Sequence, residues 1–383
     1  MSDHEAEPIK PPKKRGASVF NALYPPLLAA VLGGAMFLVG STVLPHITRT
    51  PQRAVSLEPA ASQPAPAASV PDITAEAAAE TTVTQTETTA LPAAEFDESL
   101  VYAKNALLLK LTDAGFVTLY DRGADEQIYP ASMTKIMTLI TFLDLVPGDK
   151  LNETITMDGN VIASQQAKYA YVAGFQPGEP CVIRDLIMAM MMPSGADAAV
   201  MLATYAAGDE ASFVAKMNEK AQAMGLTKTH FVNCTGLHED AHTSSVRDIA
   251  VILNEALKDP FCKAAMSTLK HTTAPTEQHP NGIELVSTTL SRQTGTELEN
   301  LPVPLHLVGG KTGFTNPAGQ CLATWAQDTA GNTYICIVAG STTNEPLNAM
   351  GDVLTIYQLT SAPAGSVQRI QPNAADLPDY VHH

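Results

Sequence analysis

Cysteine and positive charge are both scarce in this chain of 383 residues, and each scarcity excludes a class of protein. There are 23 Lys and Arg residues against 39 Asp and Glu residues, so nucleic acid, whose phosphates require clustered basic residues, is not an expected partner. The five cysteines are odd in number and form no CxxC pair, which argues against a disulfide framework and a zinc knuckle. We interpret them as scattered small core residues, with one bridged pair left open: Cys181, Cys234, Cys262, Cys321 and Cys336.

Formal charge is absent from residues 16–48, most of which are apolar, whereas Lys10, Lys13, Lys14 and Arg15 stand directly before them. About 20 apolar residues span a bilayer, and the more positive flank stays in the cytoplasm. We therefore predict a cytoplasmic basic tail over 1–15 and a transmembrane signal anchor over 16–48. The protein would then be a single-pass protein of the cell membrane, and the part of the chain after residue 48 would lie outside the cytoplasm, on the periplasmic or cell-wall side. A cleaved signal peptide is the alternative.

Aromatic and basic residues are both absent from residues 54–95, which are built mainly from Ala, Pro, Thr, Ser and Glu. This composition cannot bury enough apolar surface to offset the entropy lost on ordering the chain. We predict a disordered linker over 49–96 that separates the membrane segment from a folded domain.

Apolar runs with the spacing of strands and helices begin near Ser99 and predict a folded domain over 97–361, followed by a short tail over 362–383. Apolar runs around Asp113-Ala114-Gly115 predict a β-hairpin, and Ala330-Gly331-Asn332 predicts a turn between the last two strands. The middle of the domain has the apolar spacing of helices. Strands at both ends of a helical middle predict an α+β domain, in which helices flank an antiparallel sheet. The predicted strands are 106–111, 116–120, 305–309, 318–327 and 334–339. The predicted helices are one that begins at Ser132, followed by 184–192, 195–207, 210–224, 245–257 and 346–359.

The first motif that carries chemistry is S-x-x-K, formed by Ser132 and Lys135. Residues three apart on a helix share a face, so the Lys135 amine can reach the Ser132 hydroxyl. A serine is a weak nucleophile until a base takes its proton, and a desolvated lysine is neutral often enough to act as that base. Alone, the motif is common on solvated helix faces.

Two further motifs follow. Ser194 stands before a predicted helix and, by itself, is best explained as an N-cap residue. Lys311, Thr312 and Gly313 follow an apolar run. A glycine on a strand lets a ligand approach the backbone, and the Lys and Thr side chains can bind a carboxylate.

The order of the motifs is more specific than any one of them, because 62 residues separate Ser132 from Ser194 and 117 separate Ser194 from Lys311. Such a set occurs in class A β-lactamases and penicillin-binding proteins. From about Ser99 to Leu359 the chain resembles the low-molecular-mass serine-type D-alanyl-D-alanine carboxypeptidases, which have a penicillin-binding/β-lactamase-like domain. The resemblance rests on residues 130–135 (PASMTK), 192–195 (MPSG), 231–237 (FVNCTGL) and 311–315 (KTGFT) with 318–319 (AG).

The resemblance implies a role for each motif residue. Ser132 would attack the penultimate D-alanine carbonyl of a peptidoglycan stem peptide, Lys135 would be its base, and Ser194 would relay a proton to the leaving D-alanine. β-Lactams would acylate the same serine, and no cofactor or metal is implied.

Substrate binding is implied for the third motif. Lys311 and Thr312 would hold the terminal carboxylate, and Gly313 would allow close approach. The backbone N–H groups of Ser132 and Phe314 would form the oxyanion hole.

One residue departs from the family pattern. The second motif usually ends in Asn, and Ala196 stands there instead. A methyl group makes neither of the amide contacts, and losing one such contact costs about 2–4 kcal/mol of transition-state binding. A non-catalytic relative that binds wall peptides is therefore an alternative function.

Two other enzyme classes are weaker alternatives. His238, Glu239 and His242 match H-E-x-x-H, the zinc metallopeptidase signature, but the flanking residues lack the apolar period of a helix and predict a loop. A class A β-lactamase would need a glutamate that holds the deacylating water, and no E-x-x-L-N stretch lies between Ala196 and Lys311.

Overall fold

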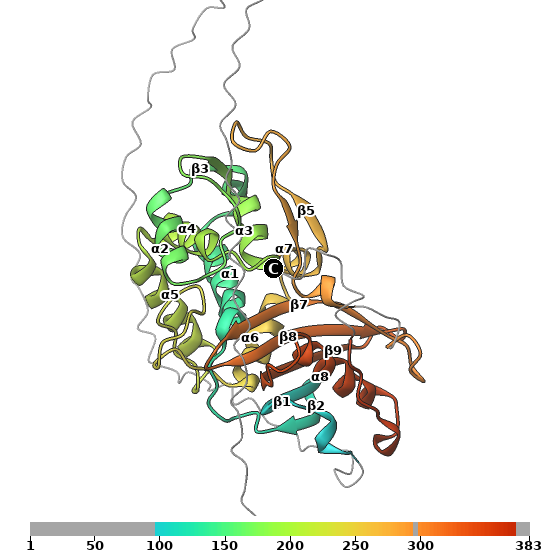
Figure 1. The fold of residues 1–383 in the computed structure, drawn as a ribbon. Helices are drawn as coiled ribbons and strands as arrows, with labels where there is room; N and C mark the ends of the chain where they lie inside the picture. The colour runs from blue at the N-terminus through green and yellow to red at the C-terminus, as the bar shows by residue number, and fades with distance from the viewer. Residues whose placement is uncertain (1–95, 294–297, 373–383) are drawn as a thin grey trace, which may run out of the picture. The chain divides into compact units, whose positions relative to one another are not determined.

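A five-stranded antiparallel sheet organises the domain in the computed structural model, which describes residues 96–293 and 298–372 (Figure 1). Its strand order is β2-β1-β9-β8-β7, so the sheet joins strands from both ends of the domain, as predicted for an α+β fold. The strands are β1 (Asn105–Thr112), β2 (Gly115–Arg122), β7 (Leu305–Thr315), β8 (Gly319–Asp328) and β9 (Thr333–Ser341).

Both predicted hairpin turns are present. Gly115 adopts φ +118° after β1, and Gly331 adopts φ +85° between β8 and β9, a conformation that costs glycine little. The Asp328 carboxylate accepts hydrogen bonds from the Ala330 and Asn332 backbone N–H groups and so stabilises the second turn.

Strand β7 is longer than the predicted strand 305–309. It continues to Thr315 because β8 pairs with it as far as Thr315 opposite Gly319. The Lys311-Thr312-Gly313 motif is therefore part of an edge strand of this sheet rather than of a loop that follows it.

Eight α-helices occur in the described residues, and α3, α4, α5 and α6 lie within one residue of the predicted ranges. Asp209 and Ser245 cap the N-termini of α5 and α6 with their side chains. Helices α2 and α7 were not predicted. The bounds are α1 (Thr134–Leu145), α2 (Gly159–Ala167), α3 (Ile183–Met191), α4 (Ala196–Ala207), α5 (Glu210–Ala223), α6 (Val246–Ala256), α7 (Pro260–Ser267) and α8 (Asn348–Tyr357).

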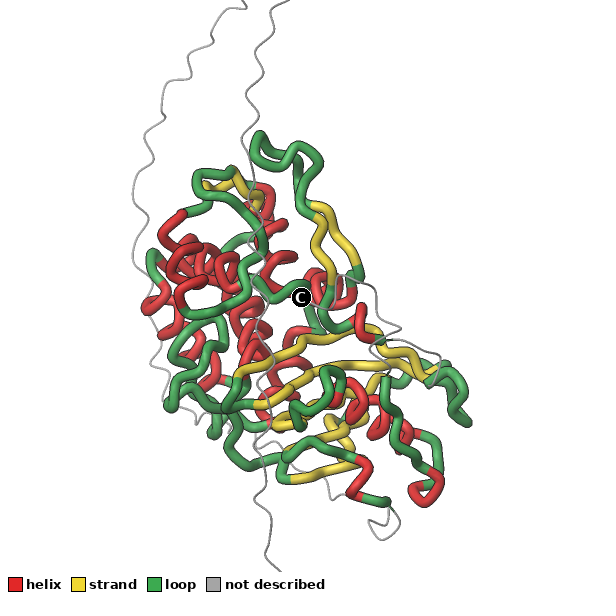
Figure 2. Tube along the Cα trace, in the orientation of Figure 1, coloured by secondary structure: helices red, strands yellow, loops and turns green. Residues whose placement is uncertain are grey.

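The sheet separates two apolar cores, because successive side chains along each strand point to opposite faces of the sheet. On β9, Ile335 and Ile337 belong to the core shared with α1 and α6, whereas Cys336 and Val338 belong to the core beneath α8. Helices α1–α5 gather on one side of the sheet in Figure 1, and the helix-coloured segments of Figure 2 show the same layering. All five cysteines are buried and free, which agrees with their interpretation as core residues.

A small hairpin, β5 (Lys270–Thr272) and β6 (Glu284–Val286), stands beside this helical layer. Two histidine–carboxylate contacts hold it: His271 Nε2 lies 2.7 Å from Asp185 of α3, and His279 Nδ1 lies 2.8 Å from the buried Glu179. The end of β6 is thereby placed next to β7.

Asp352, on α8, is fully buried and joins both ends of the domain. Its carboxylate accepts hydrogen bonds from the Tyr102 backbone N–H at 2.8 Å and the Ser341 hydroxyl at 2.6 Å. It also pairs with Arg369, whose guanidinium donates to the Leu100 carbonyl and lies over the Tyr102 ring.

Within 96–293 and 298–372, no helix is both long enough and apolar enough to cross a bilayer. The predicted basic tail (1–15), the signal anchor (16–48) and all of the predicted linker before residue 96 lie outside the described residues.

Candidate active site

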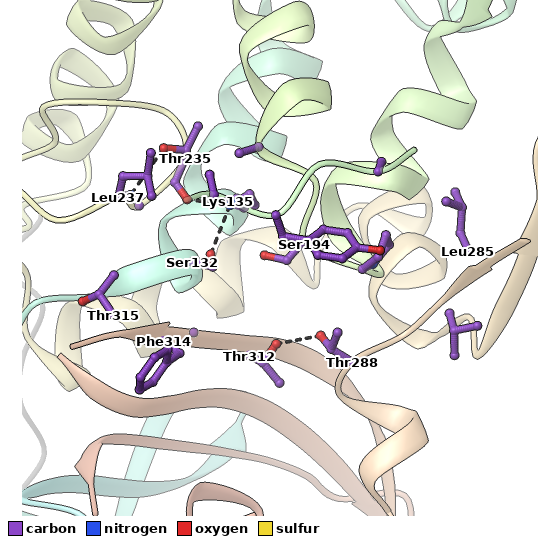
Figure 3. Close-up of a pocket in the computed structure, with 18 of the residues that line it drawn as sticks. Ser132, Lys135, Ser194, Thr235, Leu237, Leu285, Thr288, Thr312, Phe314 and Thr315 are labelled. Carbon is purple, nitrogen blue, oxygen red and sulfur yellow. Dashed lines mark hydrogen bonds between the residues drawn. The ribbon is translucent and has the colours of Figure 1, made fainter. Parts of the chain in front are cut away.

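A cavity of about 560 Å³ lies between the helical layer and strand β7, and residues of all three motifs line it (Figure 3). Ser132 and Lys135 come from the start of α1, Ser194 from the loop between α3 and α4, and Thr312 from β7. Residues that were predicted from three separate motifs therefore line the same cavity.

Ser132 lies in a 3₁₀ turn, Ala131–Met133, that runs directly into α1, so the helix begins two residues later than predicted. Its Oγ is 3.1 Å from Lys135 Nζ, which also donates to the Thr235 carbonyl at 2.5 Å. Lys135 is 1% exposed, and burial lowers its pKa to about 8. A neutral fraction of the amine therefore exists near neutral pH, with its lone pair available to Ser132.

Ser194 is paired with the second lysine of the cavity. Lys311 Nζ donates to Ser194 Oγ at 2.9 Å and to the Thr312 carbonyl at 3.0 Å. Lys311 is fully buried, and burial, followed by the charges of Lys135 and Arg292, holds its pKa well below the ordinary value.

Glycines allow two backbone segments to approach Ser132 closely. A Cβ on Gly236 would lie 1.9 Å from the Ala131 carbonyl oxygen, and a Cβ on Gly313 would lie 3.1 Å from the Ser132 nitrogen. The β7 backbone around Gly313 and Phe314 thus lies against the serine, and the Phe314 ring remains half exposed at the cavity.

Backbone strain is concentrated at this cavity. The three non-glycine residues with positive φ in the described chain are Ala131 (+47°), Tyr169 (+56°) and Ser194 (+75°). Tyr169 and Ser194 line the cavity and Ala131 precedes Ser132. Such conformations cost about 1–3 kcal/mol each and persist where the surroundings impose them, often at functional sites.

Arg292 is a cavity residue that the sequence motifs did not reveal. It follows β6 in the 3₁₀ turn Leu290–Arg292, its buried Nε has no hydrogen-bond partner, and burial lowers its pKa. Arg292 and Lys135 are the basic side chains that line the cavity, and the buried Lys311 binds the lining residue Ser194, whereas Glu284 is the only acid among the described lining residues. The cavity therefore favours an anionic group. No motif contains Arg292, so the sequence offered no signal for it.

Ala196 lines the cavity and is buried there. Its neighbour Asp197 does not line the cavity; its buried carboxylate accepts a hydrogen bond from the Ala173 backbone N–H at 3.0 Å. Asp197 therefore does not replace the amide of the missing Asn. Its negative charge instead raises the pKa of Lys135 against the effect of burial.

The H-E-x-x-H stretch is a loop, as predicted, and not the helix that a zinc peptidase requires. His242 Nδ1 accepts a hydrogen bond from the Val232 backbone N–H at 3.1 Å, and its Nε2 lies 2.8 Å from Thr134 Oγ1. Both ring nitrogens of this buried histidine are therefore engaged by the protein itself.

A serine with a buried lysine within reach of its hydroxyl, next to a second serine–lysine pair, is the arrangement that serine acyl transfer requires. The sequence model of the D-alanyl-D-alanine carboxypeptidase family matches residues 92–343, and the chain belongs to this family. The match confirms the resemblance inferred from the motifs.

Individual relatives agree with this assignment. The D-alanyl-D-alanine carboxypeptidase DacF of Bacillus subtilis (strain 168) is 32% identical over 252 residues, which are 64% of this chain and 59% of that protein. DacC of Escherichia coli (strain K12) is 30% identical over 231 residues, 59% of this chain and 54% of that protein. The chain thus spans little more than half the length of these curated relatives.

A solved structure shows the same fold. The crystal structure of the Streptomyces K15 DD-transpeptidase superimposes with a TM-score of 0.59 at 27% identity, and the match covers 68% of this chain and 97% of that one. The domain is therefore an α+β domain of the penicillin-binding type, with an antiparallel sheet flanked by helices.

Proposed function

We propose that the chain removes the terminal D-alanine from peptidoglycan stem pentapeptides through an acyl-enzyme on Ser132. The observation that carries this proposal is the 3.1 Å approach of Ser132 Oγ to Lys135 Nζ, a buried amine whose pKa is about 8. Family membership and the cationic cavity support the choice of substrate, which ends in a carboxylate.

In the acylation step, neutral Lys135 takes the Ser132 proton while Oγ attacks the penultimate D-alanine carbonyl carbon. The backbone N–H groups of Ser132 and Phe314 stabilise the oxyanion as it develops. The carbon–nitrogen bond then breaks, and the Ser194 hydroxyl, hydrogen-bonded to Lys311, gives its proton to the leaving amine while it takes up the proton that Lys135 had accepted. In deacylation, water attacks the ester carbonyl, the again neutral Lys135 takes the water proton, and that proton returns to Ser132 Oγ as the ester bond breaks.

The terminal carboxylate binds at Lys311, Thr312 and Arg292. The Arg292 guanidinium, the Lys311 amine in its charged form and the Thr312 hydroxyl bind the carboxylate through charge-assisted hydrogen bonds that a neutral group cannot make. β-Lactams, whose ring carbonyl takes the place of the scissile amide, acylate Ser132 by the same route.

Ala196 favours a second candidate function, a non-catalytic relative that binds wall peptides. Its methyl group offers the substrate amide no hydrogen bond. The intact Ser132–Lys135 contact favours catalysis over this alternative.

The location that we propose is the outer side of the cell membrane, with residues 16–48 as the anchor. The uncharged run and the basic residues before it support this proposal. Membrane fractionation followed by N-terminal sequencing tests it: the intact N-terminus is expected in the membrane fraction, and a mature start beyond Leu44 contradicts it.

The test of function uses the full-length chain in detergent, a fluorescent penicillin and a stem pentapeptide. Labelling of Ser132, located by mass spectrometry, together with D-alanine release is expected, and Ser132→Ala abolishes both. Labelling without release supports the binding alternative. No labelling of a folded sample contradicts the proposal.

A further inference from the structure

Thr288, just after β6, connects the second and third motifs. Its backbone N–H donates to the Met192 carbonyl at 3.0 Å, two residues before Ser194. Its hydroxyl oxygen lies 2.6 Å from Thr312 Oγ1 and 3.2 Å from the same Met192 carbonyl oxygen (Figure 3 draws the contact with Thr312). Thr288 also lines the cavity, so it meets the place where the substrate carboxylate is proposed to bind.

The single proton of the Thr288 hydroxyl cannot serve both neighbours at once. If it points to the Met192 carbonyl, Thr288 accepts the Thr312 proton, and Thr312 presents only lone pairs to the cavity. If it points to Thr312 instead, Thr312 is free to donate its own proton into the cavity. Met192 keeps a partner in either case, because the Thr288 backbone N–H donates to it.

We propose that Thr288 is a specificity-determining residue, whose hydroxyl turns Thr312 into a hydrogen-bond donor when a carboxylate occupies the cavity. This inference rests on the proposed function. An anion next to Lys311 and Arg292 stabilises the arrangement Thr288 O–H to Thr312 O–H to carboxylate, and each bond of such a chain polarises the next. A neutral amide at the same position attracts the Thr312 proton less. The Thr288–Thr312 hydrogen bond therefore favours a substrate that ends in a carboxylate over one that ends in an amide.

The surroundings hold Thr288 in place independently of its hydroxyl. The Ser287 backbone N–H donates to the Leu269 carbonyl at 2.9 Å, and Ser287 Oγ accepts from the Leu290 backbone N–H at 3.2 Å. The hairpin that ends there is fixed by the His271–Asp185 contact. Removing the hydroxyl alone is therefore expected to leave the backbone in position.

The experiment measures kcat/KM of the full-length chain for two matched peptides, one ending in the D-alanyl-D-alanine carboxylate and one in its C-terminal amide. Thr288→Val is expected to lower the carboxylate-to-amide preference about tenfold, mainly through a higher KM for the carboxylate peptide, which corresponds to the loss of one charge-assisted hydrogen bond. Thr288→Ser keeps the hydroxyl and is expected to retain the preference. Thr289→Val makes the same change at the next, buried position, outside the cavity lining, and serves as the control.

An unchanged preference in Thr288→Val overturns the inference while the proposed function stands. An equal fall with both peptides also overturns it, because a purely structural role would act in that way. Absence of release by the wild type, with Ser132 unlabelled by penicillin, overturns the proposed function and this inference with it. Thermal unfolding of each variant identifies any that fail to fold, and in that event Thr288→Ser against Thr288→Ala repeats the comparison.

Discussion

The two lysine–serine pairs of the cavity are built in different ways. Lys135 and Ser132 are three residues apart at the start of one helix, and Lys135 is also held by the Thr235 carbonyl. Lys311 and Ser194 are 117 residues apart, and their contact joins an edge strand to the loop before α4. The first pair depends on local structure, whereas the second exists only when the sheet and the helical layer come together.

The difference also separates two kinds of chemistry. Because the pKa of Lys135 is about 8, the amine can both lose and accept a proton near neutral pH, as a general base must. Burial, followed by the charges of Lys135 and Arg292, lowers the pKa of Lys311, and a bound anion would favour the charged form of this amine. One lysine is thus suited to moving a proton and the other to holding a carboxylate.

Removing the base should have the largest effect. Lys135→Ala is expected to lower the rate of penicillin acylation about 10³-fold or more, because the Ser132 proton loses its acceptor. Stopped-flow fluorescence with a labelled penicillin measures this rate. Lys263→Ala, which removes an exposed lysine on α7, is the matched control and should acylate like wild type. Rapid acylation of Lys135→Ala would assign the base role to another group.

Removing the second lysine should have a smaller and more selective effect. Lys311→Met is expected to lower kcat/KM for a carboxylate-ended peptide about 10²-fold, since a buried charge that pairs with the substrate is lost. An uncharged ester substrate should lose less. An equal loss for both substrates would mean that Lys311 does not distinguish the carboxylate.

The pH dependence of acylation should follow Lys135. Because the neutral amine is the proposed base, the rate is expected to rise about tenfold per pH unit below pH 8 and to level off above it. Asp197→Asn removes the negative charge that raises this pKa, so the profile should move to lower pH, while the amide oxygen still accepts from Ala173. A flat profile between pH 6 and 9 would contradict the assignment of Lys135 as base.

The smallest expected effect concerns stability rather than chemistry. Burial, followed by the charges of His230, Lys135 and His238, lowers the pKa of His242 to about 4 from 6.5. The unfolded chain therefore binds a proton that the folded chain does not, and the free energy of unfolding falls as the pH falls from about 6.5 to 4, by about 2 kcal/mol between pH 7 and pH 5. Urea unfolding at pH 7 and pH 5 measures the loss. His242→Gln should reduce the difference between the two pH values, and an unchanged difference would assign it to other groups.

Local patterns predicted much of the fold. The hairpins around Gly115 and Gly331 and the helices α3–α6 follow from turn residues and apolar period. The end of β7 could not be predicted, because the residues from Gly310 to Thr315 pair as a strand through their partner β8 rather than through their own apolar pattern.

The candidate site divides in the same manner. Ser132 and Lys135 could be paired from their spacing, and the resemblance supplied Ser194, Lys311 and Thr312. No motif contains Arg292 or Thr288, although both line the cavity. They follow the β5–β6 hairpin, which the His271–Asp185 contact holds in place. Side chains that tertiary contacts place in a site cannot be recognised from the neighbouring residues of a single sequence.

The buried carboxylate of Asp352 has a practical consequence for where the chain can be cut. Arg369, its counter-ion, lies in the stretch 362–383, which the sequence predicts to be a short tail after the folded domain. A fragment that ended at residue 361 would leave the Asp352 carboxylate buried without its counter-ion. Removing one partner of a buried ion pair costs about 3–5 kcal/mol of stability. The limit of an expressible fragment is therefore set by charge neutrality rather than by the last apolar helix, and it lies beyond Arg369.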